Sequence, residues 1–268
     1  MHSVRPAAVA GAFYPADPRT LAHDIDRMLE AAAAPPQPRA PKALIVPHAG
    51  YIYSGPIAAS AYALLKAVAA RIHRVVLLGP THRVAVRGLA LPEADIFSTP
   101  LGNIEIDQEA VKRIARLPQV TVSAQAHAME HSLEVHLPFL QTVLPDFKLL
   151  PLAVGLASPE EVAEVLEALW GGDETLIVVS SDLSHYLPYA LAKQVDSVTA
   201  QTILELRHPV SHEQACGGTP VNGLMTAARH HHLTPHLLDL RNSGDTAGDR
   251  TQVVGYAAFA FTEKEAHA

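Results

Sequence analysis

Short apolar runs alternate with amphipathic stretches along this chain of 268 residues. Three mostly aliphatic runs, at 43–46, 75–78 and 175–179, are too short for helices and are typical of buried strands. Further strands are predicted at 147–154 and 252–262, and residues 88–106 have the pattern of short strands and turns. The pattern therefore predicts a sheet built from segments spread over the whole chain.

Helices are predicted between these strands. Asp17 and Pro18 form an N-cap and first-turn pair, which predicts a helix to about residue 33 that the Pro-rich stretch 35–41 ends. The other predicted helices span 54–70, Asp107 to about 117, 188–207 and 219–232, and one begins at Ser158. Alternation of this kind predicts an α/β sandwich with a central, mostly parallel or mixed sheet flanked by helices. Because the chain shows no internal repeat and no long linker, residues 1–268 are expected to form one domain.

Composition narrows the classes of function. Hydrophobic residues make up 49% of the chain and charged residues 18%, and no apolar run reaches the length of a membrane span, so a soluble protein is expected. A net charge of −7 argues against nucleic-acid binding. One cysteine, Cys216, excludes an internal disulfide, and with no export signal at the start the cytoplasm is the expected location. Sixteen histidines favour metal or proton chemistry.

Three of the predicted strands are followed by a histidine in a sharp turn. His48 lies in Pro-His-Ala-Gly-Tyr, which ends at Tyr51; His82 ends Gly-Pro-Thr-His; and His185 ends Ser-Ser-Asp-Leu-Ser-His. For His48 or His82 alone, a structural hydrogen-bonding role is an equally good interpretation. Ligands of open α/β sheets collect beyond the carboxyl ends of the strands, so the three side chains are expected to converge. The pattern favours a metal site.

Cys216 opens a Cys-Gly-Gly turn just before a predicted helix. A lone cysteine is more often a small buried hydrophobic residue. Here the glycines leave room for close approach, and the start of a helix favours a negative charge, so the sequence favours an accessible thiolate stabilised by the helix or by a metal.

A further histidine-rich stretch occupies residues 130–138. His131 and Glu134 are three residues apart and share one face of a helix, whereas His136 points elsewhere. The zinc-protease motif needs a second histidine where this chain has a valine, so proteolysis by zinc is disfavoured. We expect His131 in the cleft and Glu134 orienting a ligand histidine, with helix capping as an equal alternative for Glu134. Asp182 is either a second such carboxylate or a turn residue.

These motifs, in this order and together with Gly-Ala-Phe-Tyr-Pro at 11–15, resemble the Memo family, whose bacterial and archaeal members are often called protein B of the AmmeMemoRadiSam system. The resemblance runs from about Pro6 to Phe261. It implies a fold similar to class III extradiol ring-cleaving dioxygenases, in which two histidines and one glutamate hold Fe(II) and another histidine does acid–base work.

The resemblance also implies roles for individual residues. By position, His48 and His82 match the two metal-ligand histidines, Cys216 matches the third ligand, and His185 matches the acid–base histidine. A cysteine in place of the dioxygenases' carboxylate argues against ring cleavage. The further residues expected around the ligands or in the cleft are His131, Glu134, Asp182 and Tyr51.

Three functions remain open at this point. The leading one is a redox protein that depends on non-haem iron or copper and resembles a dioxygenase, with Fe(II) as the expected cofactor. The second is a non-catalytic module of the same fold that binds a metal or a peptide, a reading supported by the link of animal Memo proteins with phosphopeptide recognition. The third is a hydrolase, because zinc also accepts two histidines and one cysteine. The expected ligand is an unidentified small molecule or peptide, and the system name implies a radical SAM protein as functional partner.

Overall fold

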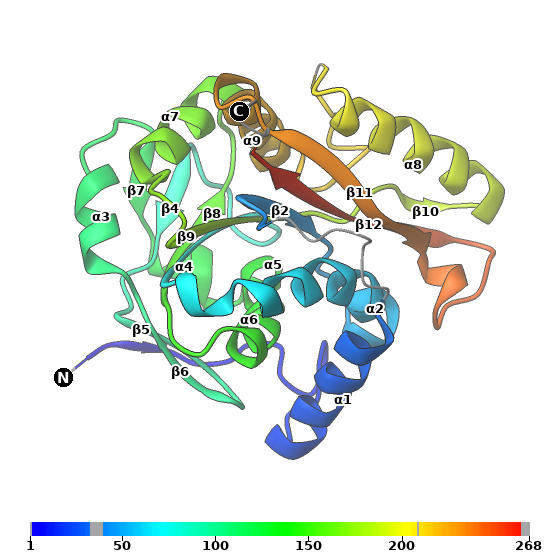
Figure 1. Cartoon of the computed structure of the whole chain (residues 1–268), viewed down its shortest axis with the longest axis horizontal. Helices are drawn as coiled ribbons and strands as arrows, with labels where there is room; N and C mark the ends of the chain where they lie inside the picture. The colour runs from blue at the N-terminus through cyan, green and yellow to red at the C-terminus, as the bar shows by residue number, and fades with distance from the viewer. Residues whose placement is uncertain (1, 33–39, 208, 264–268) are drawn as a thin grey trace.

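The computed structural model describes residues 2–32, 40–207 and 209–263. Within them, the main sheet has the strand order β10-β12-β2-β9-β3-β8-β4-β7, and β11 also pairs with β12 (Figure 1). Its strands are β2 (Ala43–Val46), β3 (Arg74–Pro80), β4 (Leu89–Leu91), β7 (Val120–Val122), β8 (Lys148–Val154), β9 (Thr175–Ser180), β10 (His185–Leu187), β11 (Thr234–Asn242) and β12 (Val253–Thr262).

The centre of this sheet is parallel. Strands β2, β9, β3 and β8 are neighbours that run in the same direction, whereas β12 and β4 flank them in antiparallel orientation. The predicted α/β fold with a mixed sheet is confirmed. Because parallel strands end at the same edge, the segments that follow β2, β3 and β9 leave the sheet side by side.

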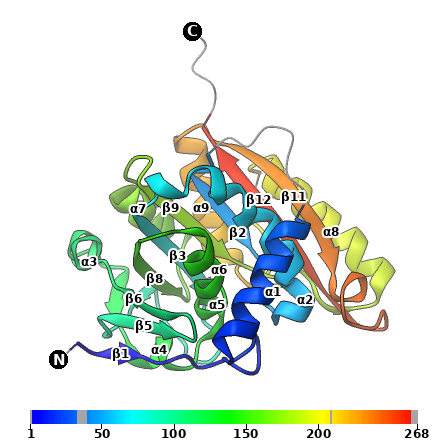
Figure 2. The ribbon, with the colours of Figure 1, turned by 60° about the horizontal axis from the view of Figure 1, so that its bottom comes forward.

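Helices cover both faces of the sheet (Figures 1 and 2). Along β2, Leu44 and Val46 join one apolar core, while Ala43 and Ile45 join the other. Burial on both faces explains why the central strands are continuous aliphatic runs. The first core also contains residues of α1 (Pro18–Ala31), α2 (Tyr51–Tyr62) and α6 (Leu137–Val143); the second contains residues of α3 (Gln108–Ile114), α7 (Pro159–Leu169), α8 (Tyr189–Leu204) and α9 (Gly218–His230).

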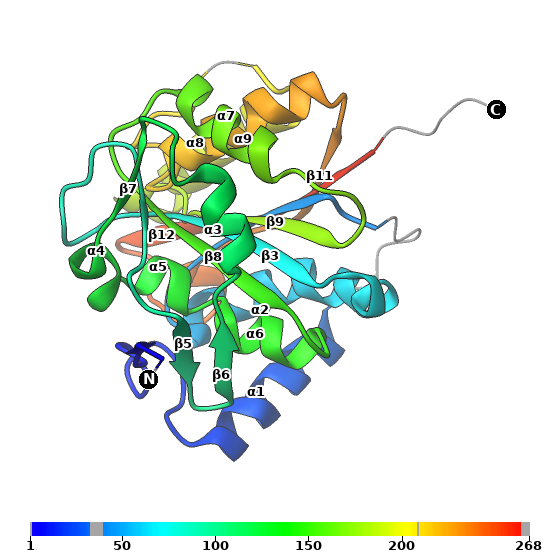
Figure 3. The same cartoon turned by 90° about the vertical axis from the view of Figure 1, so that its left-hand side faces the viewer.

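A smaller sheet holds the N-terminal segment. It consists of β1 (Val4–Arg5), β5 (Ile96–Thr99) and β6 (Gly102–Glu105), in that order, with β1 parallel to β5 (Figure 2). Figure 3 shows β5 beside β6. The predicted short strands within 88–106 are therefore confirmed, but they belong to two different sheets.

Three of the predicted helix starts are confirmed by side-chain caps. The side chain of Asp17 accepts a hydrogen bond from the backbone of Thr20 at 2.8 Å, Asp107 caps α3, and Ser158 forms a capping box at α7. The helix predicted at 54–70 instead begins at Tyr51 and continues beyond Tyr62 as two 3-10 turns, 63–67 and 69–71. Position 33, where the first helix was predicted to end, and residues 35–39 of the Pro-rich stretch lie outside the described residues.

Strand β11 was not predicted, because its residues alternate poorly between apolar and polar and most of them are only partly buried. The segment pairs with β12 alone, at the margin of the sheet. None of the described helices has both the length and the apolar character needed to cross a bilayer.

Candidate metal centre

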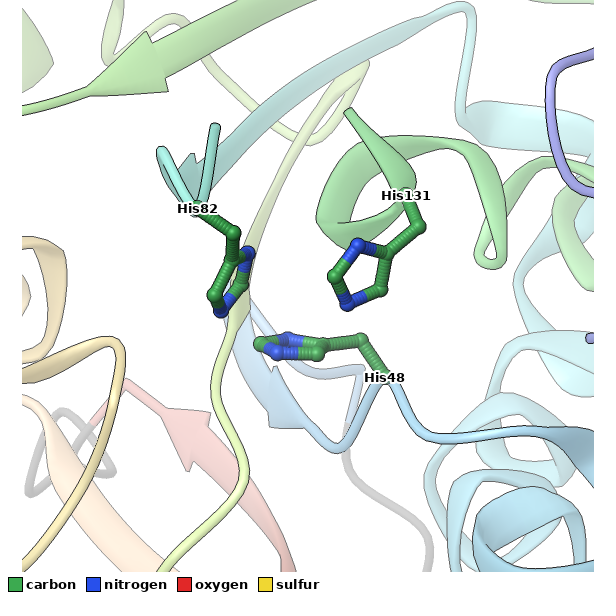
Figure 4. Close-up of side chains that lie close together, drawn as sticks. All are labelled: His48, His82 and His131. Carbon is green, nitrogen blue, oxygen red and sulfur yellow. The ribbon is translucent and has the colours of Figure 1, made fainter. Parts of the chain in front are cut away.

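Three histidines gather beyond the carboxyl ends of the parallel strands. His48 follows β2, His82 follows β3, and His131 opens the short helix α5 (His131–Glu134); their ligand nitrogen atoms lie within 4.8 Å of one another. Figure 4 shows the three rings pointing toward one another. His48 is buried, whereas the side chain of His82 is 29% exposed, so the cluster is reached from the side of His82. The predicted convergence of His48 and His82 is confirmed.

The close packing of α5 against β3 brings His131 to His82. A side chain at Gly79 would place its Cβ 2.8 Å from the hydroxyl oxygen of Ser132, so only glycine fits there without a shift. The Ser132 hydroxyl in turn donates to the carbonyl of Pro80 at 2.8 Å. The ring of His131 stacks on that of His82, with 4.6 Å between the ring centres.

Glu130 orients His82. One oxygen of its buried carboxyl group lies 2.8 Å from Nδ1 of His82, and the other accepts the backbone N–H of His82 at 2.6 Å. Burial raises the pKa of Glu130, but these hydrogen bonds and one from the backbone of Ser132 outweigh it and lower the pKa to about 2. A charged carboxylate only accepts, so Nδ1 of His82 carries the proton and its Nε2 keeps a free lone pair for a metal.

The role expected of Glu134 therefore belongs to Glu130. Glu134 is fully buried, and its carboxylate accepts hydrogen bonds from the Tyr14 hydroxyl at 2.6 Å and from the backbone N–H groups of residues 8–9, and it pairs with Arg5. These partners all lie in the N-terminal segment. Glu134 thus anchors that segment to α5 and has no hydrogen bond to a histidine among the described residues.

Cys216 lies beside His48, with its sulfur 3.3 Å from Nε2 of that ring. A Cβ at Gly217 would come within 2.4 Å of the Ser180 carbonyl oxygen, which explains why the turn needs a glycine to approach the end of β9. Cys216 is not part of the cluster formed by the three histidines.

The surroundings of Cys216 favour its protonated form. Burial, and then the nearby charge of Asp182, raise the pKa of the Cys216 thiol to about 12. The start of α9 does not offset them, so the thiol keeps its proton at neutral pH. A metal bound to the sulfur would replace that proton and leave a thiolate.

The other predicted residues surround this centre. Asp182 accepts the backbone N–H of His48 at 2.7 Å, and burial raises the pKa of Asp182 to about 7. His185 opens β10, is partly buried, and does not belong to the histidine cluster. Tyr51 is buried and donates its hydroxyl hydrogen to the carbonyl of Val135 at 2.6 Å, so it links α2 to the end of α5.

A groove with a volume of about 1140 Å³ adjoins the centre. It lies between the loop 11–15, one face of α1, the start of α2 and part of β11. Phe13 contributes to its wall and also packs against His131, with 4.7 Å between the ring centres. Phe13 is therefore the contact between the groove and the histidine cluster.

The ligand nitrogens of the three histidines have nearly the spacing that one metal ion requires, and the Cys216 sulfur lies within ligand distance of His48. Two nitrogen ligands of one ion can lie up to about 4.2 Å apart, because each metal–nitrogen bond is about 2.1 Å long. The histidine cluster meets this limit after a shift of a few tenths of an ångström, and the 3.3 Å between the Cys216 sulfur and Nε2 of His48 lies within it. Imidazole and thiolate together suit iron, copper or zinc.

Comparisons with known proteins agree with the motifs. The pattern of the family described as Memo-like protein matches residues 5–260. A MEMO1 family protein of Aquifex aeolicus is 37% identical over 96% of this chain and 99% of its own length, and one of Methanosarcina barkeri is 36% identical over 95% and 98%. The crystal structure of protein JW3007 from Escherichia coli K12 shares the fold, with a TM-score of 0.50, 15% identity and coverage of 83% of this chain and 100% of that chain. The chain belongs to the Memo family.

Proposed function

We propose that this protein holds one redox-active metal ion, Fe(II) or else copper, on His48, His82 and Cys216 and acts as an oxidoreductase. The contact that carries the proposal is the one between Nε2 of His48 and the sulfur of Cys216, at 3.3 Å, beside the histidine cluster. It directs a nitrogen and a sulfur donor to one position.

The three ligands leave room for a substrate. Two histidines and one anionic ligand on one side of a metal leave its other positions open, and a metal so held supplies redox and Lewis-acid chemistry. In this chain the exposed side of His82 is the approach for a ligand. His131, stacked on His82, lies next to that approach and is available to contact what binds there.

His185 is proposed as the proton carrier. Burial lowers the pKa of His185, so its ring is neutral at neutral pH and is able to accept a proton. A positive charge on His82 would lower the pKa of His185 further.

The test is oxygen uptake by protein loaded with a single metal under anaerobic conditions. Fe(II)-loaded protein is expected to consume oxygen when its ligand is supplied by a cell extract, and the uptake should vanish with a chelator and in His82→Ala. Variant His185→Gln should keep the metal and lose the uptake. Absence of uptake with either iron or copper, together with hydrolytic activity of the zinc-loaded protein, would replace this proposal by a hydrolase.

A second function has its own support. The groove beside Phe13 is large enough for a small molecule or a peptide segment, and a protein that only binds would use it together with the metal. Substitution Phe13→Ala distinguishes the two functions. It should alter ligand affinity in both, but it should alter the rate of oxygen uptake only if there is turnover.

A further inference from the structure

The hydroxyl oxygen of Ser180, the last residue of β9, has three short polar contacts. It lies 2.7 Å from Nδ1 of His48, 2.8 Å from Nε2 of His136 and 2.6 Å from the carbonyl oxygen of Ser132. A serine hydroxyl has one hydrogen to donate and two lone pairs to accept with. The three contacts therefore use its full capacity.

The direction of each hydrogen bond follows. The carbonyl of Ser132 cannot donate, so the Ser180 hydrogen lies on that contact. The two remaining contacts are to lone pairs of Ser180, so both ring nitrogens must carry a hydrogen. His48 is thereby held as the tautomer with the proton on Nδ1, and its Nε2 keeps a lone pair.

Tyr62 holds the far end of this chain of hydrogen bonds. Its hydroxyl lies 2.8 Å from Nδ1 of His136, and burial raises the pKa of Tyr62, so the hydroxyl remains a donor. His136, with its proton on Nε2, accepts there and donates to Ser180. Every donor and every acceptor along the path is matched.

The other tautomer of His136 would destabilise this chain of hydrogen bonds. If His136 carried its proton on Nδ1, the Ser180 hydrogen would turn to His136, and two oxygen atoms of Ser180 and Ser132 would face each other at 2.6 Å with no hydrogen between them. Ser180, His136 and Tyr62 are all buried, so solvent does not relieve such a conflict. A buried acceptor that is left without a hydrogen bond destabilises the folded protein.

We propose that Ser180, backed by His136 and Tyr62, is a positioning residue that fixes the tautomer of His48 and so presents Nε2 to the metal. This inference rests on the proposed metal site, but the tautomer itself exists without a metal. His136 is thereby assigned a supporting role behind the centre. The same Nε2 lone pair faces the sulfur of Cys216.

Nitrogen NMR of the histidine rings tests the tautomer directly. The protein is labelled with ¹⁵N-histidine and treated with a chelator, and spectra are recorded near neutral pH. The signals that disappear in His48→Gln are those of His48. We expect a protonated Nδ1 and an unprotonated Nε2. The reverse pattern overturns the proposal, whether or not the protein binds a metal.

Substitutions test the consequence for the metal, with Zn²⁺ alone as the probe. Ser180→Ala should shift the His48 proton to Nε2 and weaken Zn²⁺ binding about 10- to 100-fold, as loss of such outer partners does in other metal sites. Ser180→Thr keeps the hydroxyl and should restore both properties. The control is Ser184→Ala, since the buried Ser184 hydroxyl has no hydrogen-bond partner among the described residues.

The possible outcomes test the positioning role of Ser180 and the proposed metal site separately. Unchanged Zn²⁺ affinity and tautomer in folded Ser180→Ala overturn the inference, and so does weaker binding with an unchanged tautomer. If wild-type protein shows the expected tautomer but binds neither Zn²⁺ nor Fe(II), the proposed function fails while the assignment of Ser180 stands. If Ser180→Ala does not fold, the wild-type NMR pattern alone decides.

Discussion

The carboxylate of Glu130 binds His82 twice, through the ring Nδ1 at 2.8 Å and through the backbone N–H at 2.6 Å. This pair fixes both the position and the proton of a candidate ligand. Substitution Glu130→Gln should weaken metal binding about 10- to 100-fold, because an amide no longer holds the imidazole proton on Nδ1. Competition with a chromogenic chelator measures the change. Wild-type affinity in a well-folded variant would remove Glu130 from the metal site.

Glu134, one helical turn later, should respond differently. Substitution Glu134→Gln leaves the buried guanidinium of Arg5 without its charged partner and should lower the free energy of unfolding by about 3–5 kcal/mol. Urea denaturation of Glu134→Gln and of Glu130→Gln measures this effect. The folded fraction should still bind metal as the wild type does, so a loss of metal that exceeds the loss of folded protein would contradict the anchoring role.

The third ligand is decided by comparing Cys216→Ser with His131→Ala. If Cys216 is a ligand, its replacement should weaken Cu(I) binding more than Fe(II) binding, because a hydroxyl is a harder and poorer donor than a thiolate. His131→Ala should retain the metal, because in that case His131 is not a ligand and lies at the open side of the metal. Elemental analysis after dialysis gives both results. Retention in Cys216→Ser with loss in His131→Ala would assign the third position to His131.

Acid stability should depend on His127, a buried residue outside the metal site. Its Nε2 donates to the carbonyl of Ala90 at 2.8 Å, and burial outweighs that bond and lowers the pKa of His127 to about 4. The unfolded chain binds this proton near its ordinary pKa, so it holds more protons than the folded protein between those two values. The free energy of unfolding should therefore fall as the pH decreases from about 6.5 to about 4, by about 3 kcal/mol from this group.

The matched measurement is urea denaturation across that pH range. His127→Gln keeps an N–H for the Ala90 carbonyl but cannot take up the proton, so the pH dependence should become shallower by about one proton. His23→Gln, at an exposed position on α1, should leave the pH dependence unchanged. An equal pH dependence of unfolding free energy in wild type and His127→Gln would show that the folded protein does not hold His127 in its neutral form.

Local sequence patterns predict well which strands position the histidines of the candidate metal centre. His48 and His82 follow aliphatic runs, and the geometry of parallel strands then requires their convergence. His131 could be placed in the cleft but not in the cluster, because its position depends on how closely α5 packs against Gly79, the penultimate residue of β3.

The roles of the supporting residues could not be predicted from the sequence, for a similar reason. Glu130 and Glu134 lie one turn apart in one motif, and which of them meets His82 is decided by the N-terminal segment, whose Arg5 and Tyr14 occupy Glu134. Ser180 is the last residue of β9, and nothing in the local sequence indicates which side chains its hydroxyl contacts. Its role follows only from distances to residues that are far away in the sequence.

Metal content after anaerobic purification tests the central claim most directly. Wild-type protein is expected to carry about one metal ion per chain, and His48→Ala and His82→Ala should each lose most of it while keeping the wild-type circular dichroism, because each removes one of three protein ligands. Iron or copper in the wild type would support the redox proposal, and zinc would favour the hydrolase. Full metal occupancy in both well-folded variants would contradict the account, because the ion would then be held elsewhere.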